Sequence, residues 1–231
     1  MAETNEDKPH FPRLLICEGP EDCFFFHRLI ETRNLPRFHI WHTGGRKHSR
    51  GGNAKFGEAI AGFQISRPKT FASLRDIVIV ADNDEAPKDN FDNVCRQIDE
   101  FFGAGSAPSK PLERTTKIKP AVSVLMIPWA SLNGHLERLC VPSARDADKT
   151  IGKDVDTFMA LIGAEKWNND SRFGKAWLRT NLAVRCVVDP FVALGKVFDE
   201  DKHHQLIPVN HSSFKDIADF LITFNVQGTK A

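Results

Sequence analysis

Two short apolar runs that each lead into acidic residues constrain the fold more than any other feature of this chain. The runs are residues 14–17 (LLIC) and 77–81 (IVIVA). The acidic residues that follow them are Glu18, Asp22, Asp82 and Asp84. Apolar runs of this length are typical of strands buried on both faces, which belong to parallel sheets. Open parallel sheets bind ligands at the carboxyl ends of their strands, so we expect a binding site there.

Expected strands and helices alternate along the first half of the chain. The strands are expected at residues 13–17, 38–41, 74–81 and 121–127, and the helices between them at 21–33, 54–63 and 91–102. This order is typical of a parallel sheet with right-handed crossovers. After Pro128 the pattern becomes helical, with segments expected at 131–140, 154–162, 171–187, 190–197 and 214–224.

The predicted fold class is therefore α/β, with a mostly parallel sheet flanked by helices and a C-terminal helical extension. The predicted divisions are a flexible N-terminus at 1–12, an α/β core at 13–142 and a helical extension at 143–231 that packs on the core. A Pro-, Ser- and Lys-rich segment at 103–120 is expected to be an exposed, mobile loop.

Composition is that of an ordinary globular protein. With 231 residues, of which 41% are hydrophobic, the chain can bury a core. A net charge of +1 argues against coating nucleic acid through bulk charge, so a polyanion would be recognised locally. The five cysteines form no C-x-x-C pair that would indicate a zinc knuckle. No stretch approaches the ~20 apolar residues of a membrane span, so we expect a cytoplasmic protein without membrane contact.

The spacing of the acidic residues predicts a metal site. Side chains two residues apart in an extended segment point to the same side, so Asp82 and Asp84 can face one ion. Glu18 would join them from an adjacent strand end. Ligation by oxygen alone favours Mg²⁺ or Mn²⁺ over Zn²⁺. The competing interpretation is that strand ends are polar because they meet solvent, with Asp-Asn-Asp forming a turn.

Several short motifs resemble one known family. Glu18-Gly19 after the first expected strand and the Asp-x-Asp of 82–84 after the third resemble the TOPRIM fold of topoisomerases, bacterial primases, small RNA maturases and OLD-type nucleases. The nearer resemblance is to small stand-alone relatives of the OLD nuclease TOPRIM domain. Segments 18–25 (EGPEDCFF), 44–47 (GGRK), 82–85 (DNDE) and 134–139 (GHLERL) also fit that group.

The resemblance implies roles for individual residues. Glu18, Asp82 and Asp84 would be the catalytic residues and would bind metal, with Glu18 as a metal ligand or a general acid or base. Asp22 and Glu137 match further acidic positions and would complete a second site. Two ions suit phosphodiester chemistry because one activates water while the other stabilises the leaving oxygen. The alternative interpretations are a favourable helix N-terminal charge for Asp22 and a solvated helix face for Glu137.

A glycine-rich basic segment at 44–52 is the candidate for contacting phosphate. Its glycines permit close backbone approach and its cations supply positive charge. The residues expected to contact phosphate are Gly44, Gly45, Arg46, Lys47 and Arg50. The segment lacks the Gly-Lys-Ser/Thr ending of a nucleotide-binding P-loop, and a solvated basic loop is the alternative interpretation.

These features favour a Mg²⁺- or Mn²⁺-dependent nuclease or related phosphodiesterase acting on DNA or RNA. The chain has no tyrosine, so it cannot be a complete topoisomerase of the type that uses a tyrosine nucleophile. The alternative is a non-catalytic metal- or phosphate-binding module that docks a partner such as a separate ATPase. A receiver-type phosphotransfer domain is a weaker rival, because no strand-end lysine follows Ile127. The sequence leaves the oligomeric state open, and a role in phage defence would follow only by analogy with OLD-like relatives.

Overall fold

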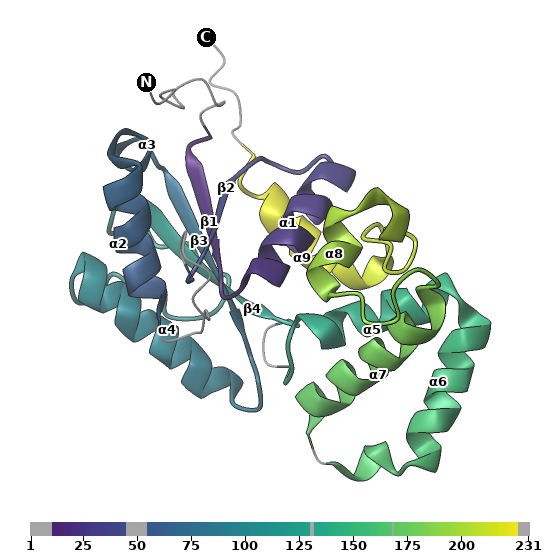
Figure 1. Ribbon diagram of the computed structural model, residues 1–231. Helices are drawn as coiled ribbons and strands as arrows, with labels where there is room; N and C mark the ends of the chain where they lie inside the picture. The colour runs from purple at the N-terminus through teal and green to yellow at the C-terminus, as the bar shows by residue number, and fades with distance from the viewer. Residues whose placement is uncertain (1–10, 45–54, 130–131, 168, 226–231) are drawn as a thin grey trace.

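The chain folds around a four-stranded parallel sheet. The computed structural model describes residues 11–44, 55–129, 132–167 and 169–225. The strands are β1 (Arg13–Cys17), β2 (His39–His42), β3 (Asp76–Asp82) and β4 (Ala121–Ile127), in the spatial order β2-β1-β3-β4 (Figure 1). All three strand pairs are parallel, which confirms the predicted α/β class.

The strand order reverses between β1 and β3. From β1 the chain moves outward to β2 on one side, and it then returns to place β3 and β4 on the other side. Ile16 pairs with Ile79, so Glu18 and Asp82 leave the sheet next to one another. Crevices that bind ligands in open parallel sheets lie at such a switch point, at the carboxyl ends of the strands.

Helices cover both faces of the sheet, as the alternation of side chains along β1 requires. Leu14 and Ile16 point toward a core formed with α2 (Phe56–Ser66) and α4 (Pro87–Phe102). Leu15 and Cys17 point to the opposite face, which is covered by α1 (Pro20–Thr32) and the C-terminal helices (Figure 1). A short helix that the sequence did not predict, α3 (Pro68–Ala72), lies between α2 and β3.

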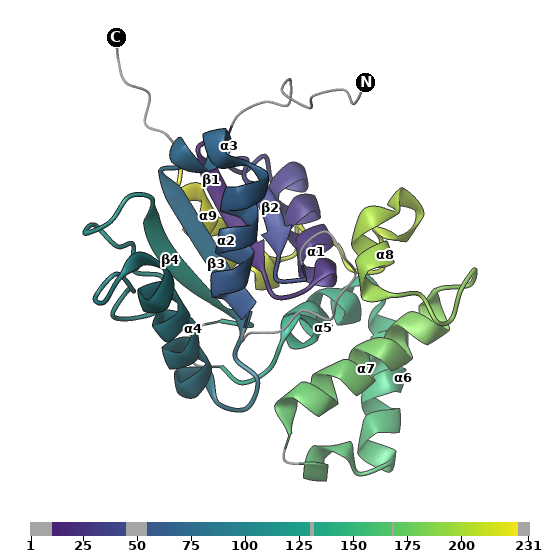
Figure 2. The ribbon, with the colours of Figure 1, turned by 60° about the vertical axis from the view of Figure 1, so that its left-hand side comes forward.

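The C-terminal half is helical, as predicted. Its helices are α5 (Leu136–Ala147), α6 (Lys149–Leu161), α7 (Asp170–Arg185), α8 (Leu194–Asp199) and α9 (Lys215–Ile222), with short 3₁₀ segments at Ala164–Trp167, Asp201–His203 and Ser212–Phe214. In Figure 2 the paired helices α6 and α7 lie beyond α5, away from β1 and β2. The predicted helix at 131–140 begins late: α5 starts at Leu136, because residue 134 is instead bridged to Asp84.

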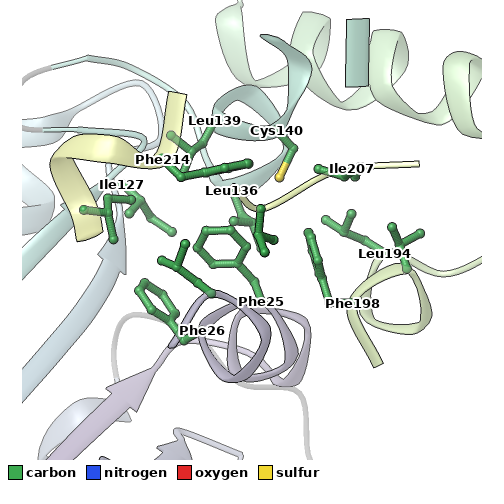
Figure 3. Close-up of a cluster of buried hydrophobic side chains, with 14 of the residues drawn as sticks. Phe25, Phe26, Ile127, Leu136, Leu139, Cys140, Leu194, Phe198, Ile207 and Phe214 are labelled. Atoms are coloured by element: carbon green, nitrogen blue, oxygen red, sulfur yellow. The ribbon is translucent and has the colours of Figure 1, made fainter. Parts of the chain in front are cut away.

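The C-terminal helices share a core with the sheet. Phe25 of α1 packs edge-on against Phe198 of α8, at 5.3 Å between ring centroids, and lies 5.2 Å from the ring of Phe214 (Figure 3). The same cluster includes Leu15 of β1 and Leu136 of α5. The predicted boundary at 142/143 lies inside α5, and residues on both sides of it are buried together.

The segment at 103–120 contains no helix or strand and many of its residues are exposed, as expected, but backbone hydrogen bonds hold it against β4. Leu112 N–H donates to the Val124 carbonyl at 2.8 Å, and Thr115 N–H donates to the Val122 carbonyl at 2.9 Å, so the segment lies along β4. Arg114 forms a 2.5 Å ion pair with Asp76 at the amino end of β3. The backbone N–H groups of Leu112 and Thr115 thus pair with the edge of β4, a contact that the sequence pattern did not reveal.

Candidate metal centre

The carboxyl ends of β1 and β3 bring together the first two predicted acidic positions. Glu18 follows β1, and its Oε2 accepts a long 3.4 Å hydrogen bond from the backbone N–H of Asp82. Asp22 lies in the first turn of α1, where its Oδ2 accepts from Gly19 N–H at 2.8 Å. Asp22 is 8% exposed, although a capping carboxylate at a helix start is commonly solvated. Its burial next to the strand ends indicates more than helix capping.

Backbone pairing and an asparagine fix the segment from Asp82 to Asp84. Asp84 and Gly134 exchange backbone hydrogen bonds of 2.9 and 2.7 Å, which closes the segment before α5 onto the end of β3. Asn90 of α4 donates its side-chain amide toward the carbonyls of Asp82 and Asn83 and toward Asp84 Oδ2, at 3.0–3.3 Å. Asp84 has a φ of +47°, so this contact network holds a strained backbone at the site.

His135 joins the two aspartates and was not predicted as a site residue. Its Nδ1 lies 2.8 Å from Asp84 Oδ1 and 3.4 Å from Asp82 Oδ2. Burial lowers the pKa of His135, but hydrogen bonds to both carboxylates outweigh it and raise that pKa to about 9. The hydrogen bond from His135 also lowers the pKa of Asp84, although burial opposes this effect. The imidazolium is therefore the cation paired with the aspartates in this structure.

Two of the carboxyl groups carry a large electrostatic cost. Burial raises the pKa of Asp22 well above its ordinary value, and the charges of Asp82, Glu18 and Glu137 raise it further. Burial also raises the pKa of Asp82, although His135 offsets part of this. All five predicted metal ligands thus belong to one electrostatic cluster. Glu137 comes from the first turn of α5, where it is half-buried.

The chemistry of this cluster fits a hard divalent cation, but its side chains do not form a ready coordination shell. Within the described ranges, no group of three or more His, Cys, Asp or Glu residues is placed to hold one ion. The Oδ1 atom of Asp82 is nonetheless buried without a hydrogen-bond partner. An unpartnered buried carboxylate oxygen among further carboxylates is a donor that Mg²⁺ or Mn²⁺ would satisfy. A dication at this oxygen would lie beside the His135 imidazolium and repel it.

The predicted phosphate-binding segment falls mostly outside the described residues. Gly44 is buried directly after β2, and its N–H donates to the ring Nδ1 of His42 at 3.1 Å. It therefore follows the carboxyl end of a strand, at the same edge of the sheet as Glu18. The remaining predicted phosphate contacts, Gly45, Arg46, Lys47 and Arg50, lie outside the described residues.

A cysteine and a histidine that are distant in sequence meet in the helical half. Cys186 Sγ lies 3.8 Å from His203 Nδ1, and the other ring nitrogen of His203 lies 3.4 Å from Glu200 Oε2. Such an order of groups is also found in enzymes with a cysteine nucleophile. Here Cys186 is 4% and His203 5% exposed, which leaves no access for a substrate. We therefore interpret the pair as part of the core.

Fold and site define an α/β protein with a carboxylate cluster at the switch point of a parallel sheet. The chain belongs to the family described as "Protein of unknown function (DUF3226)", whose model matches residues 12–224. That match includes β1 through α9, and with them every residue of the cluster. A search of curated proteins and a search of solved structures each gave no match.

None of the helices in the described part of the chain combines the length and the apolar composition needed to cross a bilayer.

Replacing Asp22 with asparagine is expected to stabilise the metal-free protein at pH 8. The asparagine keeps an acceptor for Gly19 N–H but removes a buried negative charge next to Asp82. Most point mutations destabilise by about 1 kcal/mol, so a gain would identify electrostatic cost at this position. Urea unfolding in EDTA measures the change. The exposed Asp89→Asn is the matched control and should change stability by less than about 0.5 kcal/mol. A loss of stability in Asp22→Asn would contradict the expected charge cost.

Proposed function

We propose that this protein is a Mg²⁺- or Mn²⁺-dependent nuclease or related phosphodiesterase that acts on DNA or RNA through a TOPRIM-like carboxylate site. The observation that supports it most is the convergence of Glu18, Asp22, Asp82 and Asp84 at the sheet's switch point. So many carboxylates around one buried, unpartnered oxygen are costly for folding, which is typical of sites retained for function.

In this proposal the carboxylates divide into two groups. Glu18, Asp82 and Asp84 would hold a first ion, and Asp22 with Glu137 would complete a second site. Bound divalent ions supply an activated water and charge stabilisation for the leaving oxygen. Asn90 orients Asp84 through its side-chain amide. The backbone pairing of Gly134 with Asp84 fixes the position of the next residue, His135. The imidazolium of His135 pairs with Asp82 and Asp84 in the metal-free protein and would be repelled by a dication bound there.

Cleavage assays on labelled nucleic acids test this proposal. Single-stranded DNA, duplex DNA and RNA of one sequence are incubated with the protein in Mg²⁺, in Mn²⁺ and in EDTA. We expect cleavage of at least one substrate in Mg²⁺ or Mn²⁺, and none in EDTA. Absence of cleavage in every metal, by protein whose folding is verified by circular dichroism, would contradict a nuclease.

A non-catalytic metal- or phosphate-binding module is the second candidate, and one observation favours it. The described side chains form no complete coordination shell, and His135 occupies the two aspartates. Titration calorimetry with Mn²⁺ separates the candidates when it is combined with the cleavage assays. Metal binding without turnover would favour the module, whose partner could then be a separate ATPase.

A further inference from the structure

Three cations of α7 form a row beside the carboxylate cluster. Arg172, Lys175 and Arg179 follow one another at intervals of three and four residues, which places them within about 60° of one face of the helix. We call these three residues the α7 cation row. They are far in sequence from the basic segment at 44–52. Only the fold shows that this row lies beside the carboxylate cluster.

The α7 cation row lines the same pocket as Asp84 of the carboxylate cluster. This pocket has a volume of about 590 Å³, and its lining includes Asp84, His135 and all three cations. The charge of Lys175 lowers the pKa of Asp84, after the larger effect of His135, and it also lowers the pKa of His135. The cation row and the end of β3 therefore face one pocket.

The three cations have their charges available to a ligand. Among the residues described, no salt bridge is formed by Arg172, Lys175 or Arg179, whereas the neighbouring Arg138 is paired with Asp170. Arg172 is held in place by stacking, with its guanidinium carbon 4.3 Å from the centre of the Trp167 ring. A row of unpaired cations on a half-exposed helix face is typical of a surface that meets phosphates.

Glu85 fastens this helix to the end of β3. Its Oε1 accepts a 3.1 Å hydrogen bond from Ser171 N–H in the first turn of α7, and its Oε2 accepts from Asn133 at 3.5 Å. Glu85 directly follows Asp84, so its hydrogen bond to Ser171 links the aspartate to the start of the α7 cation row. Both oxygens of its carboxylate accept these hydrogen bonds, so the segment after β3 is fixed against the start of α7.

We propose that the α7 cation row binds the phosphodiester backbone of a nucleic acid strand and presents it to the carboxylate cluster. The row extends about 10 Å along the helix axis, which matches about three nucleotides of a strand at 3.4 Å each. The proposal rests on the proposed function for its substrate class and adds where that substrate lies. It places the strand on the α7 side of the pocket, across from Asp84 and His135.

Oligonucleotide binding in EDTA tests the proposal without any need for cleavage. Fluorescence anisotropy is measured with a labelled single-stranded DNA, its RNA equivalent and a duplex, between 50 and 300 mM salt. The test variant carries Arg172→Gln, Lys175→Gln and Arg179→Gln together. We expect its affinity at 100 mM salt to fall at least about tenfold, with a single-strand salt slope shallower by about 2, because three phosphate contacts are lost. The three probes identify which form of nucleic acid is bound.

The matched control removes the same charge from the opposite end of the sheet. Lys69 lies before β3, and Lys117 and Lys119 lie before β4; all three side chains are exposed. The triple variant Lys69→Gln, Lys117→Gln, Lys119→Gln should bind within about twofold of wild type, because a local contact and not net charge determines affinity.

The outcomes separate this proposal from the proposed function. Equal binding by the α7 variant and the wild type, or no binding by the wild type, would overturn the α7 surface. Binding that depends on α7 without cleavage in any metal would support the surface and reject the nuclease. Metal-dependent cleavage with an unchanged KM in the α7 variant would support the nuclease and reject the α7 surface. Circular dichroism and thermal melting verify that each triple variant is folded.

Discussion

Asp82→Asn and Glu18→Gln are each expected to abolish metal-dependent cleavage while leaving the fold intact. Asp82 is the residue on which the carboxylate cluster converges: it is the last residue of β3, it is contacted by His135, and its backbone N–H meets Glu18. Removing a group that only supports a metal ligand commonly costs 10- to 100-fold, so loss of a ligand should cost more than about 100-fold. Initial cleavage rates in saturating Mn²⁺ measure the effect.

The control for this comparison is Asp89→Asn, which makes the same chemical change on an exposed carboxylate in the first turn of α4. Its rate should stay within about twofold of wild type, since among the described residues no hydrogen bond or ion pair connects Asp89 to the cluster. Calorimetry with Mn²⁺ on the same variants locates the defect. Undiminished cleavage in both Asp82→Asn and Glu18→Gln would reject the assignment of these residues to the metal site.

Short apolar runs made the sheet predictable because burial on both faces demands them. The strands at 13–17 and 121–127 have the predicted bounds, because runs dominated by Leu, Ile and Val favour a strand buried on both faces; the second run includes one polar residue, the buried Ser123. The structure departs from the predictions where contacts between distant segments determine the local conformation. The segment at 103–120 pairs with the edge of β4, and α5 begins five residues late because Gly134 is held by Asp84.

The carboxylates of the candidate site were predictable, and the groups that hold them were not. Glu18, Asp82 and Asp84 follow apolar runs, which is a local signal, and Asp22 is one helical turn beyond Glu18. His135 reaches the aspartates from the residue before α5, about 50 positions later in the sequence, and Asn90 reaches them from the first turn of α4, where no apolar run marks it. A histidine after a glycine has no such local signal. The same holds for the α7 cations, which lie near Asp84 because the chain folds back and the first turn of α7 bonds to Glu85.

Phe25→Ala is expected to lower the free energy of unfolding by about 3–5 kcal/mol, the cost of deleting a large buried aromatic side chain. Phe25 is fully buried on α1, and its ring contacts Phe26, Phe198 and Phe214. Through these rings it joins the sheet to α8 and to the segment before α9. Urea unfolding followed by tryptophan fluorescence and by circular dichroism measures the change.

The neighbouring Phe24 is the matched control, because it has the same side chain on the same helix but is 38% exposed. Phe24→Ala should lower the free energy of unfolding by much less, about 1 kcal/mol, because the ring of Phe24 packs against Gly195 of α8 but stays partly exposed. Both variants should unfold in one transition by both probes, since residues on either side of 142/143 share a core. Two separate transitions, of which Phe25→Ala shifts only one, would instead show that the helical half folds as an independent domain. In that case the sheet and its carboxylates would fold without α7, and the pocket between Asp84 and the cation row would depend on docking of two domains.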